Sequence, residues 1–300
     1  KQIMAKIQAL SILIPTYNQV CTSLVKQLIP LLQTAAIHYE VIVADDGSTD
    51  EATIESNRIL SDYPNCHYIR RNENVGRAAI RNFLAETAQY DHLLFIDSDM
   101  TVISDHFIQR YLSCSDEAVI DGGVSIKSDN AKIRSHNLRY LYEIAEAPKH
   151  TVSQRQQSPY QHLHTANLLI RRNLIRQYPF DERFRYYGYE DVLLGKTLHQ
   201  HHIPITHIDN PVGFQYFESN SDFVAKTEEG LRTLYQFQNE LRGYSRLLKF
   251  IHGIHIPIIL NTIRLYHRLF KQMERKNLCG SRPNLTVFKL YRLGFFLTLK

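Results

Sequence analysis

Two aspartates, Asp97 and Asp99, stand directly after a run of four large apolar residues at 93–96. Such a run is typical of a strand that is buried on both faces of a sheet. Because side chains alternate along an extended chain, the two carboxylates point to the same side while Ser98 points away. Ligands of open α/β sheets bind beyond the carboxyl ends of the strands, and carboxylates suit Mg²⁺ or Mn²⁺ held against a diphosphate. The alternative is a polar strand end that turns into a loop.

A second pair of acids, Asp45 and Asp46, follows the strand-like segment at 39–44, which ends in four apolar residues. A carboxylate there could accept hydrogen bonds from a base or from ribose hydroxyls. The run 45–50 also has the composition of a βα turn with a helix N-cap, so a purely structural role is the alternative.

Arg77 and Arg81 follow Gly76 and lie four residues apart in an Ala-rich segment, so they share one face near a helix N-terminus. Two guanidiniums at a helix N-terminus suit a diphosphate. A solvated basic face is the alternative. Further along, Glu190 and Asp191 open another apolar segment, where acids could also serve only to stabilise the helix dipole.

The elements that must position these residues alternate along the chain. Strands are expected at 9–14, 39–44, 67–70 and 93–96, with a helix at 22–34 and further helices between them. Pro15 should end the first strand. This βαβ order predicts an α/β fold with a Rossmann-like, mainly parallel central sheet flanked by helices. Later strands are expected at 119–124, with a glycine turn, and at 164–172, where an ordinary edge strand is the alternative.

Four motifs in this order resemble the family 2 glycosyltransferases of the GT-A fold. They are Pro-Thr-Tyr-Asn at 15–18, Asp-Asp-Gly-Ser-Thr-Asp at 45–50, Asn-Val-Gly-Arg-x-x-x-Arg-Asn at 74–82 and Asp-Ser-Asp at 97–99. A fifth segment, 180–191, looks like the Phe-Asp-Glu-x-Phe…Gly-x-Glu-Asp pattern of the galactosyltransferase-like branch. The resemblance covers about residues 9 to 235.

The resemblance implies a nucleotide-sugar donor, usually a UDP-sugar, bound by the first half of the chain. Asp45 or Asp46 would contact uracil or ribose, Arg81 would face the diphosphate, and Asp99 would coordinate Mn²⁺ or Mg²⁺. Asp97 would approach ribose or metal. The full donor-binding set is Pro15, Thr16, Tyr17, Asp45, Asp46, Gly76, Arg77, Arg81, Asp97 and Ser98.

The second half would bind the acceptor. Inverting transfer needs a carboxylate within reach of the attacking hydroxyl, and this role is assigned to Asp191, with Glu190 as a partner of an acceptor hydroxyl. A glycine before the acids leaves room for a sugar. Thr165 and Asn167 point the same way along the expected strand. The acceptor-binding candidates are therefore Thr165, Asn167, Gly188 and Tyr189.

One position departs from the family pattern. Relatives often place a metal-binding histidine shortly after the segment 207–212, where this chain has Phe214. We expect either that Asp99, the diphosphate and water hold the ion, with Asp97 nearby, or that His207 substitutes. Weak or absent metal dependence is the alternative to a bound Mn²⁺ or Mg²⁺.

The charge of the chain is unevenly distributed. Residues 242–300 contain 12 of the 35 Lys and Arg but one of the 30 acids, Glu274. We therefore expect a GT-A domain at 1–241, with a donor half at about 9–125 and an acceptor half at about 126–241, followed by a basic helical tail at 242–300. An amphipathic helix at 258–272 favours an anionic membrane surface over nucleic acid as the partner. The alternative is a helix packed on the catalytic domain.

Four widely spaced cysteines suit a reducing compartment, and no signal peptide or uninterrupted transmembrane run is visible, which together favour the cytoplasmic face of a membrane. The expected function is inverting transfer from a UDP-sugar to a glycan or glycolipid hydroxyl, in the biosynthesis of a surface polysaccharide or glycoconjugate. The alternative is a nucleotide-sugar-binding or scaffolding protein without turnover, which the missing histidine alone supports.

Overall fold

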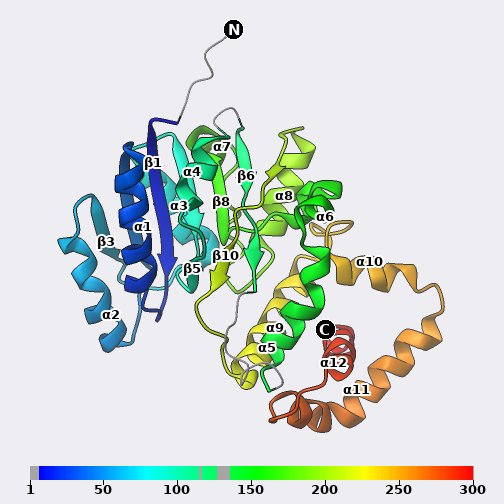
Figure 1. The fold of residues 1–300 in the computed structure, drawn as a ribbon. Coiled ribbons are helices and arrows are strands. Elements are labelled where there is room, and N and C mark those ends of the chain that lie inside the picture. Colours follow the sequence, from blue (N-terminus) through cyan, green and yellow to red (C-terminus); the bar gives the residue numbers. More distant parts are fainter. Residues whose placement is uncertain (1–6, 115–116, 127–135, 300) are drawn as a thin grey trace.

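The computed structural model describes residues 7–114, 117–126 and 136–299. Its centre is a seven-stranded sheet in the order β3-β2-β1-β4-β8-β6-β9 (Figure 1). β1 to β4 run parallel, whereas β8 runs antiparallel to both of its neighbours. The strands are β1 (Ala9–Thr16), β2 (His38–Asp45), β3 (Cys66–Arg70), β4 (His92–Ile96), β6 (Val119–Asp121), β8 (Asn167–Arg171) and β9 (Thr206–His207). The expected mainly parallel α/β sheet is confirmed.

The central strands are buried on both faces. In β4, Leu94 and Ile96 join one apolar cluster, whereas Leu93 and Phe95 join another on the opposite face. This split follows from the two-residue period of a strand. The continuous apolar runs of the sequence therefore place the carboxyl ends of these strands, and the residues that follow them, at one edge of a rigid sheet.

Helices cover both faces of the sheet. One face packs against α1 (Thr22–Ala35) and α4 (Phe107–Leu112), and the other against α3 (Arg77–Thr87), α7 (Arg172–Gln177), α8 (Glu190–Gln200) and α9 (Asn220–Gln236). The remaining helices before residue 242 are α2 (Glu51–Arg58), α5 (Leu138–Glu146), α6 (Val152–Gln157) and the 3₁₀ turns at 59–62, 147–149 and 159–162.

Two expectations about strands are corrected. β1 continues past Ile14 to Thr16, because its pairing with β2 extends to Thr16, while its pairing with its other neighbour, β4, extends only to Leu13. Pro15 therefore needs no N–H on the β4 side. The strand expected at 164–172 begins only at Asn167, and it lies between β4 and β6 rather than at an edge.

A small second sheet, in the order β5-β10-β7, stands beside the end of β4. It contains β5 (Met100–Val102), β7 (Val124–Ser125) and β10 (Val212–Phe214). The expected strand at 119–124 is thus divided between two sheets, with Gly123 (φ +84°) at the turn. This sheet fixes the backbone directly after Asp99, because Phe214 pairs with Met100 and the N–H of Gln215 donates to the carbonyl of Asp99 at 2.9 Å.

The C-terminal segment is helical, with α10 (Arg246–Gly253), α11 (Pro257–Leu278) and α12 (Leu285–Thr298). These helices lie together at one side of the molecule, with α11 outermost (Figure 1). α12 packs on α9 and α5 through Phe288 and Tyr291. Among the described residues, no helix combines the length and the apolar character that crossing a membrane requires. All four cysteines are free thiols.

Candidate active site

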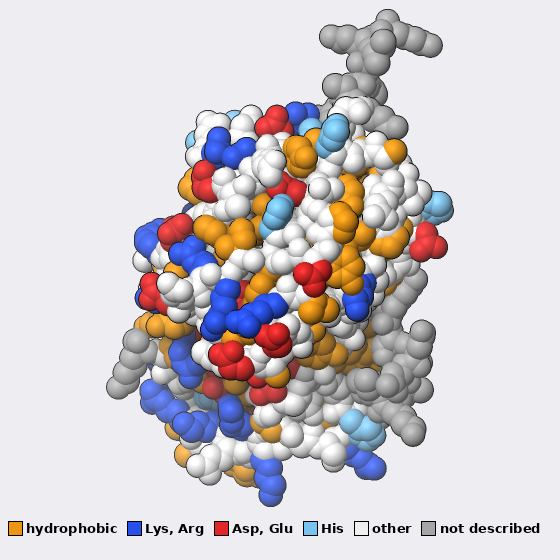
Figure 2. Space-filling model, turned by 90° about the vertical axis from the view of Figure 1, so that its left-hand side faces the viewer, with side chains coloured by type: hydrophobic (Ala, Val, Ile, Leu, Met, Phe, Trp, Pro, Cys, Tyr) orange, Lys and Arg blue, Asp and Glu red, His pale blue; other side chains and the backbone are white. Residues whose placement is uncertain are grey.

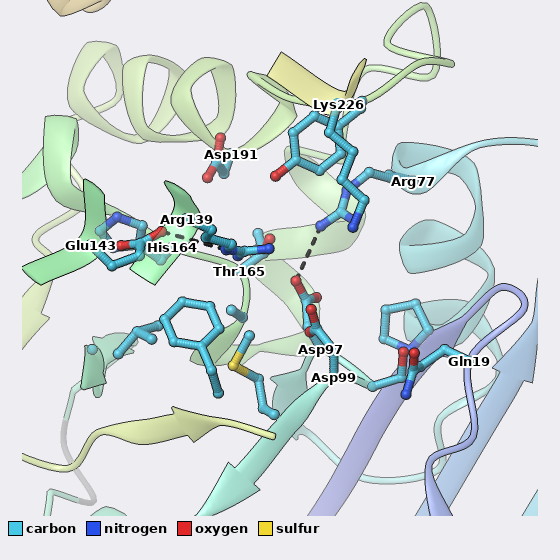
Figure 3. Close-up of a pocket in the computed structure, with 18 of the residues that line it drawn as sticks. Gln19, Arg77, Asp97, Asp99, Arg139, Glu143, His164, Thr165, Asp191 and Lys226 are labelled. Carbon is cyan, nitrogen blue, oxygen red and sulfur yellow. Dashed lines mark hydrogen bonds and ion pairs between the residues drawn. The ribbon is translucent and has the colours of Figure 1, made fainter. Parts of the chain in front are cut away.

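A cavity of about 1450 Å³ opens where β1 and β4 end. Its volume exceeds the roughly 300–1,000 Å³ of a typical pocket for one small ligand, so it has room for two substrates. Figure 3 shows Asp97, Asp99 and Arg77 on one side of the cavity and Asp191, His164 and Glu143 on another. The wall is formed mainly by the segments 15–19, 76–81, 97–100, 123–126, 139–152, 164–166 and 185–187, with Asp191, Phe214, Tyr216 and Lys226.

The loops after β1 and β2 are tied to each other. Asn18, at φ +48°, donates its backbone N–H to Ser48 Oγ at 2.7 Å, and its side-chain oxygen accepts from the N–H of Thr49 at 2.8 Å. These bonds fix the segment that carries Pro15, Thr16 and Tyr17 along the cavity wall. Tyr17 is 47% exposed, so its ring is open to a ligand.

The carboxylates of Asp45 and Asp46 are bound by the protein itself. Asp45 is fully buried, accepts from the N–H of Ser48 at 2.7 Å and from the Tyr68 hydroxyl, and does not line the cavity. Asp46 lines the cavity, but its carboxylate accepts from the N–H groups of Val75 and Gly76 at 3.0 and 2.9 Å. The expectation that Asp45 contacts a base or ribose is therefore corrected, and Asp46 orders the turn that starts α3.

Two arginines and two carboxylates form a partly buried ion-pair cluster. Asp97 accepts from Arg81 at 2.6 Å and from Arg77 at 3.1 Å, and Glu190 Oε1 accepts from the same two guanidiniums at 3.3 and 3.0 Å. Burial opposes ionisation of Asp97, but the two guanidiniums hold its pKa below the usual value. The cluster joins the end of β4 to the start of α8, so it connects the first and second halves of the catalytic domain's sequence.

The cluster changes the expected roles of two residues. The Arg81 side chain is only 1% exposed and is committed to both carboxylates, whereas 37% of the Arg77 side chain is exposed. Arg77 also lies over the ring of Tyr187. Of the two guanidiniums, that of Arg77 is therefore more open to the cavity, whereas Arg81, which was expected to face a diphosphate, is held within the cluster. Glu190 is buried, ion-paired and outside the cavity wall, so it is not placed to meet an acceptor hydroxyl.

The carboxylate of Asp99 is open to the cavity. It lines the cavity, and in the described part of the chain no side-chain hydrogen bond to its carboxylate is present. Burial and the neighbouring Asp97 raise its pKa, while Arg139, Arg77 and Lys226 act in the opposite direction. Residues 7–114, 117–126 and 136–299 contain no cluster of three His, Cys, Asp or Glu that would form a complete metal site. A single carboxylate with water and substrate phosphates still suits Mg²⁺.

His207 is not placed to substitute for a missing metal ligand. It is buried at the end of β9, where its Nδ1 lies 3.0 Å from Arg155 Nη1 and its Nε2 lies 3.0 Å from the carbonyl of Pro159. It does not line the cavity. The suggestion that His207 could bind the ion is therefore corrected, since both ring nitrogens already have protein partners.

Asp191 lines the cavity from the first turn of α8. Its Oδ1 accepts from the N–H of Val192 at 2.7 Å. Burial and the adjacent Glu190 raise the pKa of Asp191 to about 6, and His164 acts against this rise. His164 is itself held by Asp121, which accepts from its backbone N–H at 2.7 Å and forms an ion pair with Arg155 at 2.8 Å. At neutral pH the arrangement provides an ionised carboxylate that is more basic than an exposed aspartate.

Among the expected acceptor residues, only Thr165 lines the cavity. The Asn167 side chain is fully buried, accepts from Tyr111 at 2.6 Å and donates to the carbonyls of Gly123 and Asn210 at 2.9 and 2.8 Å. It fixes the core instead of facing a substrate. Gly188 (φ +92°) and Tyr189 (φ +73°) turn the chain into α8 and lie outside the cavity wall. These three assignments are corrected.

The cavity also contains residues that the sequence analysis did not identify. Arg139 of α5 donates from Nη1 to the two carboxylate oxygens of Glu218 at 2.8 and 2.6 Å. Glu143, one turn later in α5, has its Oε1 3.7 Å from Nε of Arg139. Lys226 of α9 reaches Glu218 at 3.4 Å. The N-cap Asn137 could have located α5 in the sequence, because its side chain accepts from the N–H of Tyr140. The pairing of Arg139 with a residue 79 positions away leaves no local pattern.

Comparisons with known proteins agree with this geometry. The model of Glycosyl transferase family 2 matches residues 11–179, which is more than half of the chain. The chain therefore belongs to glycosyl transferase family 2, and its fold is the GT-A fold of glycosyltransferases.

Individual relatives share shorter segments. An uncharacterized glycosyltransferase of Haemophilus influenzae is 34% identical over 96 residues, which cover 32% of this chain and 38% of that protein. A poly(ribitol-phosphate) beta-glucosyltransferase of Bacillus spizizenii is 34% identical over 109 residues, which cover 34% of this chain and 16% of that protein. The chain thus spans well under two thirds of the length of these relatives.

Solved structures match over nearly the whole chain. The S. aureus TarS 1-349 structure in complex with UDP has a TM-score of 0.50 at 17% identity, with 96% of this chain and 89% of that chain covered. The mannosyltransferase PcManGT from Pyrobaculum calidifontis, in complex with GDP-Man and Mn²⁺, has a TM-score of 0.54 at 11% identity, with coverage of 96% and 84%. At these identities the similarity establishes the fold.

Proposed function

We propose that this glycosyltransferase transfers a sugar from a UDP-sugar to a hydroxyl group of a glycan or glycolipid, with inversion at the anomeric carbon. The observation that supports this most is the position of Asp191. Its carboxylate, with a pKa of about 6, lines the same cavity as Asp99, Arg77 and the segment 15–19. A general base near neutrality and a site for a diphosphate therefore share one volume.

In the proposed reaction one proton is transferred, and the bond from the anomeric carbon to the diphosphate is replaced by a bond to the acceptor oxygen. Asp191 accepts the proton of the acceptor hydroxyl while that oxygen attacks the anomeric carbon from the face opposite the diphosphate. The bond between the anomeric carbon and the diphosphate oxygen breaks, and its electron pair leaves with UDP. Arg77, with 37% of its side chain exposed, stabilises the negative charge that develops on the leaving group.

For the cofactor we propose Mn²⁺ or Mg²⁺, bound by Asp99 together with oxygens of the donor diphosphate and water. The support is the open carboxylate of Asp99 and the Mn²⁺ in the structure of the mannosyltransferase from P. calidifontis. When bound, the ion would neutralise charge on the diphosphate. Asp97 contributes indirectly, because its carboxylate is already bound by Arg77 and Arg81.

For the donor and the biological setting, the names of similar proteins supply the proposal. UDP is present in the TarS complex, and the B. spizizenii relative is named as acting on poly(ribitol-phosphate). We propose a UDP-sugar donor and a role in polysaccharide or glycoconjugate biosynthesis at the cytoplasmic face of a membrane, which the basic residues of 242–300 would approach. Nucleic acid is not expected as a partner.

Asp191→Asn tests the base. We expect transfer to fall by about 10²–10⁴-fold while UDP binding stays within about twofold of wild type, because the base acts on the acceptor and not on the nucleotide. Transfer is measured with a panel of UDP-sugars and glycan acceptors, and UDP binding by calorimetry. Near-normal transfer by the variant would remove Asp191 from this role. UDP binding by wild type without turnover of any donor would favour a binding protein.

Asp99→Asn tests the cation site. The variant should lose Mn²⁺-dependent enhancement of UDP binding and transfer together, since one carboxylate holds the ion that contacts the diphosphate. Mn²⁺ titrations of UDP affinity provide the measurement. Asp46→Asn is the matched control, because the Asp46 carboxylate also lines the cavity but is bound to backbone N–H groups. Equal Mn²⁺ responses in wild type and Asp99→Asn would contradict the assignment.

A further inference from the structure

Helix α11 has an apolar stripe on the side that faces away from the protein. Ile258, Leu265, Leu269 and Met273 are 70%, 58%, 68% and 69% exposed. Their spacing of seven, four and four residues places them on one side of a helix. The opposite side, with His267, Glu274 and Leu278, is buried against the protein. The four exposed residues are called the α11 stripe.

The stripe belongs to a larger apolar surface. Of the fourteen large apolar side chains that are exposed in the described residues, nine lie in the segment 250–273. They include Phe250 of α10, at 56%, and Ile256 at the start of α11, at 54%. Single exposed apolar residues are ordinary, but a concentrated patch marks a contact surface.

The charges around the stripe have one sign. Arg268, Lys271 and Lys276 are exposed on α11, as is Lys249 on α10. Within the described part of 242–300 the one acid is Glu274, whose carboxylate is buried 2.7 Å from His267 Nδ1. Figure 2 views the molecule from the side opposite α11, and the lowest part of that face shows several Lys and Arg side chains with a few apolar ones.

An apolar stripe flanked only by cations suits an anionic lipid surface better than a second copy of this chain. In a symmetric dimer the same patch meets itself, so Arg268 and Lys276 would face the corresponding cations of the partner. In a lipid interface the stripe enters the acyl boundary while Lys and Arg contact the headgroups. α11 has 22 residues and would lie parallel to the surface.

We propose that the α11 stripe inserts into the interface of an anionic membrane, with Arg268, Lys271 and Lys276 on the headgroups. This names the surface behind the membrane setting proposed above, and its consequence for the acceptor rests on that proposed function. α12 packs between α11 and α5, and α5 carries Arg139 and Glu143 on the cavity wall. Docking through α11 thus places the membrane on the acceptor side, which suits a lipid-linked acceptor.

The absence of tryptophan from the chain allows a direct test. Leu269→Trp would place the single tryptophan in the stripe of the full-length protein. Its emission should shift to the blue, and brominated phosphatidylcholine should quench it, in vesicles that contain phosphatidylglycerol. Ile59→Trp is the matched control, because Ile59 is 44% exposed in the 3₁₀ turn 59–62, far along the chain from the stripe. Its emission should not change.

Substitution of the stripe provides a second measurement. The triple variant Leu265→Ser, Leu269→Ser and Met273→Ser should bind these vesicles at least about tenfold more weakly in co-sedimentation, because it removes most of the inserted apolar area. High salt should weaken wild-type binding in the same assay.

Two outcomes would overturn the proposal. One is an emission spectrum of the Leu269→Trp variant that stays the same when vesicles are added, whether or not they contain phosphatidylglycerol. The other is a blue shift that grows with protein concentration in the absence of lipid, which would indicate self-association through the stripe. Vesicle binding by the Asp191→Asn variant separates this result from failure of the proposed transfer reaction, because binding needs no turnover.

Discussion

At the scale of residues, Asp191 links burial to chemistry. Burial beside Glu190 raises the pKa of Asp191 to about 6, and the base proposed here acts only when it is ionised. We therefore expect kcat/KM for transfer to be constant above this pKa and to fall about tenfold per pH unit below it. UDP affinity measured over the same pH range serves as the control. A flat profile down to about one pH unit below this pKa would show that another group accepts the proton.

Arg81 and Arg77 provide a second prediction at this scale. Arg81→Met should destabilise the fold by about 3–5 kcal/mol, because it removes a fully buried guanidinium and leaves the partly buried Asp97 and the buried Glu190 carboxylate short of a partner. Arg77→Met removes a partly exposed guanidinium and should cost about 1 kcal/mol or less while reducing transfer. Urea unfolding of both variants gives the measurement. Equal losses of stability would mean that the difference in burial has no energetic effect.

The residues of the site differ in how far the sequence predicts them. Asp99 comes shortly after an apolar strand, and Asp191 lies in the first turn of a helix. Local sequence patterns therefore indicate the positions of both residues. The contact of Arg81 with Glu190 joins residues 109 positions apart, and no local period encodes it. Asn167 shows the same limit, because whether a polar side chain in a strand faces a ligand or the core depends on neighbours such as Tyr111.

At the scale of elements, the start of α3 depends on a glycine. Gly76 has φ +95°, and an added Cβ would lie 2.4 Å from the carbonyl oxygen of Arg185. Gly76→Ala should therefore weaken UDP binding and stability together, because the turn that carries Arg77 must move. Gly243→Ala is the matched control, with φ +83° but open space around the added Cβ. The Gly243→Ala variant introduces backbone strain without a steric clash, and this strain should lower the free energy of unfolding by about 1 kcal/mol.

The measurement is UDP affinity and thermal unfolding of both glycine variants. If Gly76→Ala behaves like Gly243→Ala, contact with the Arg185 segment does not position the turn. The strands β1, β2 and β4 were predictable because each contains at least three consecutive apolar residues, but β9 has only two residues and β10 only three. Such short strands form through pairing with distant segments, which a period in the sequence cannot indicate.

At the scale of the whole molecule, residues 242–300 are both a surface and part of the core. Phe288, Tyr291 and Phe296 of α12 are at most 5% exposed, and Phe288 packs with Leu138 of α5 and Val224 of α9. The tail therefore has features of both expected alternatives: α12 packs on the catalytic domain and α11 presents an apolar face outward. Truncation before Gly243 would remove buried side chains together with the α11 stripe.

Single substitutions separate these two contributions. Phe288→Ala should destabilise the whole protein by about 3–5 kcal/mol, because it opens a cavity between α5, α9 and α12. Phe250→Ala should change stability by less than about 0.5 kcal/mol, since that ring is 56% exposed. Urea unfolding followed by circular dichroism compares the two, and UDP affinity reports on the cavity that α5 lines. If Phe288→Ala unfolds at the wild-type urea concentration, the tail is an independent appendage, and its packing on α5 cannot couple a docked membrane surface to the acceptor side of the cavity.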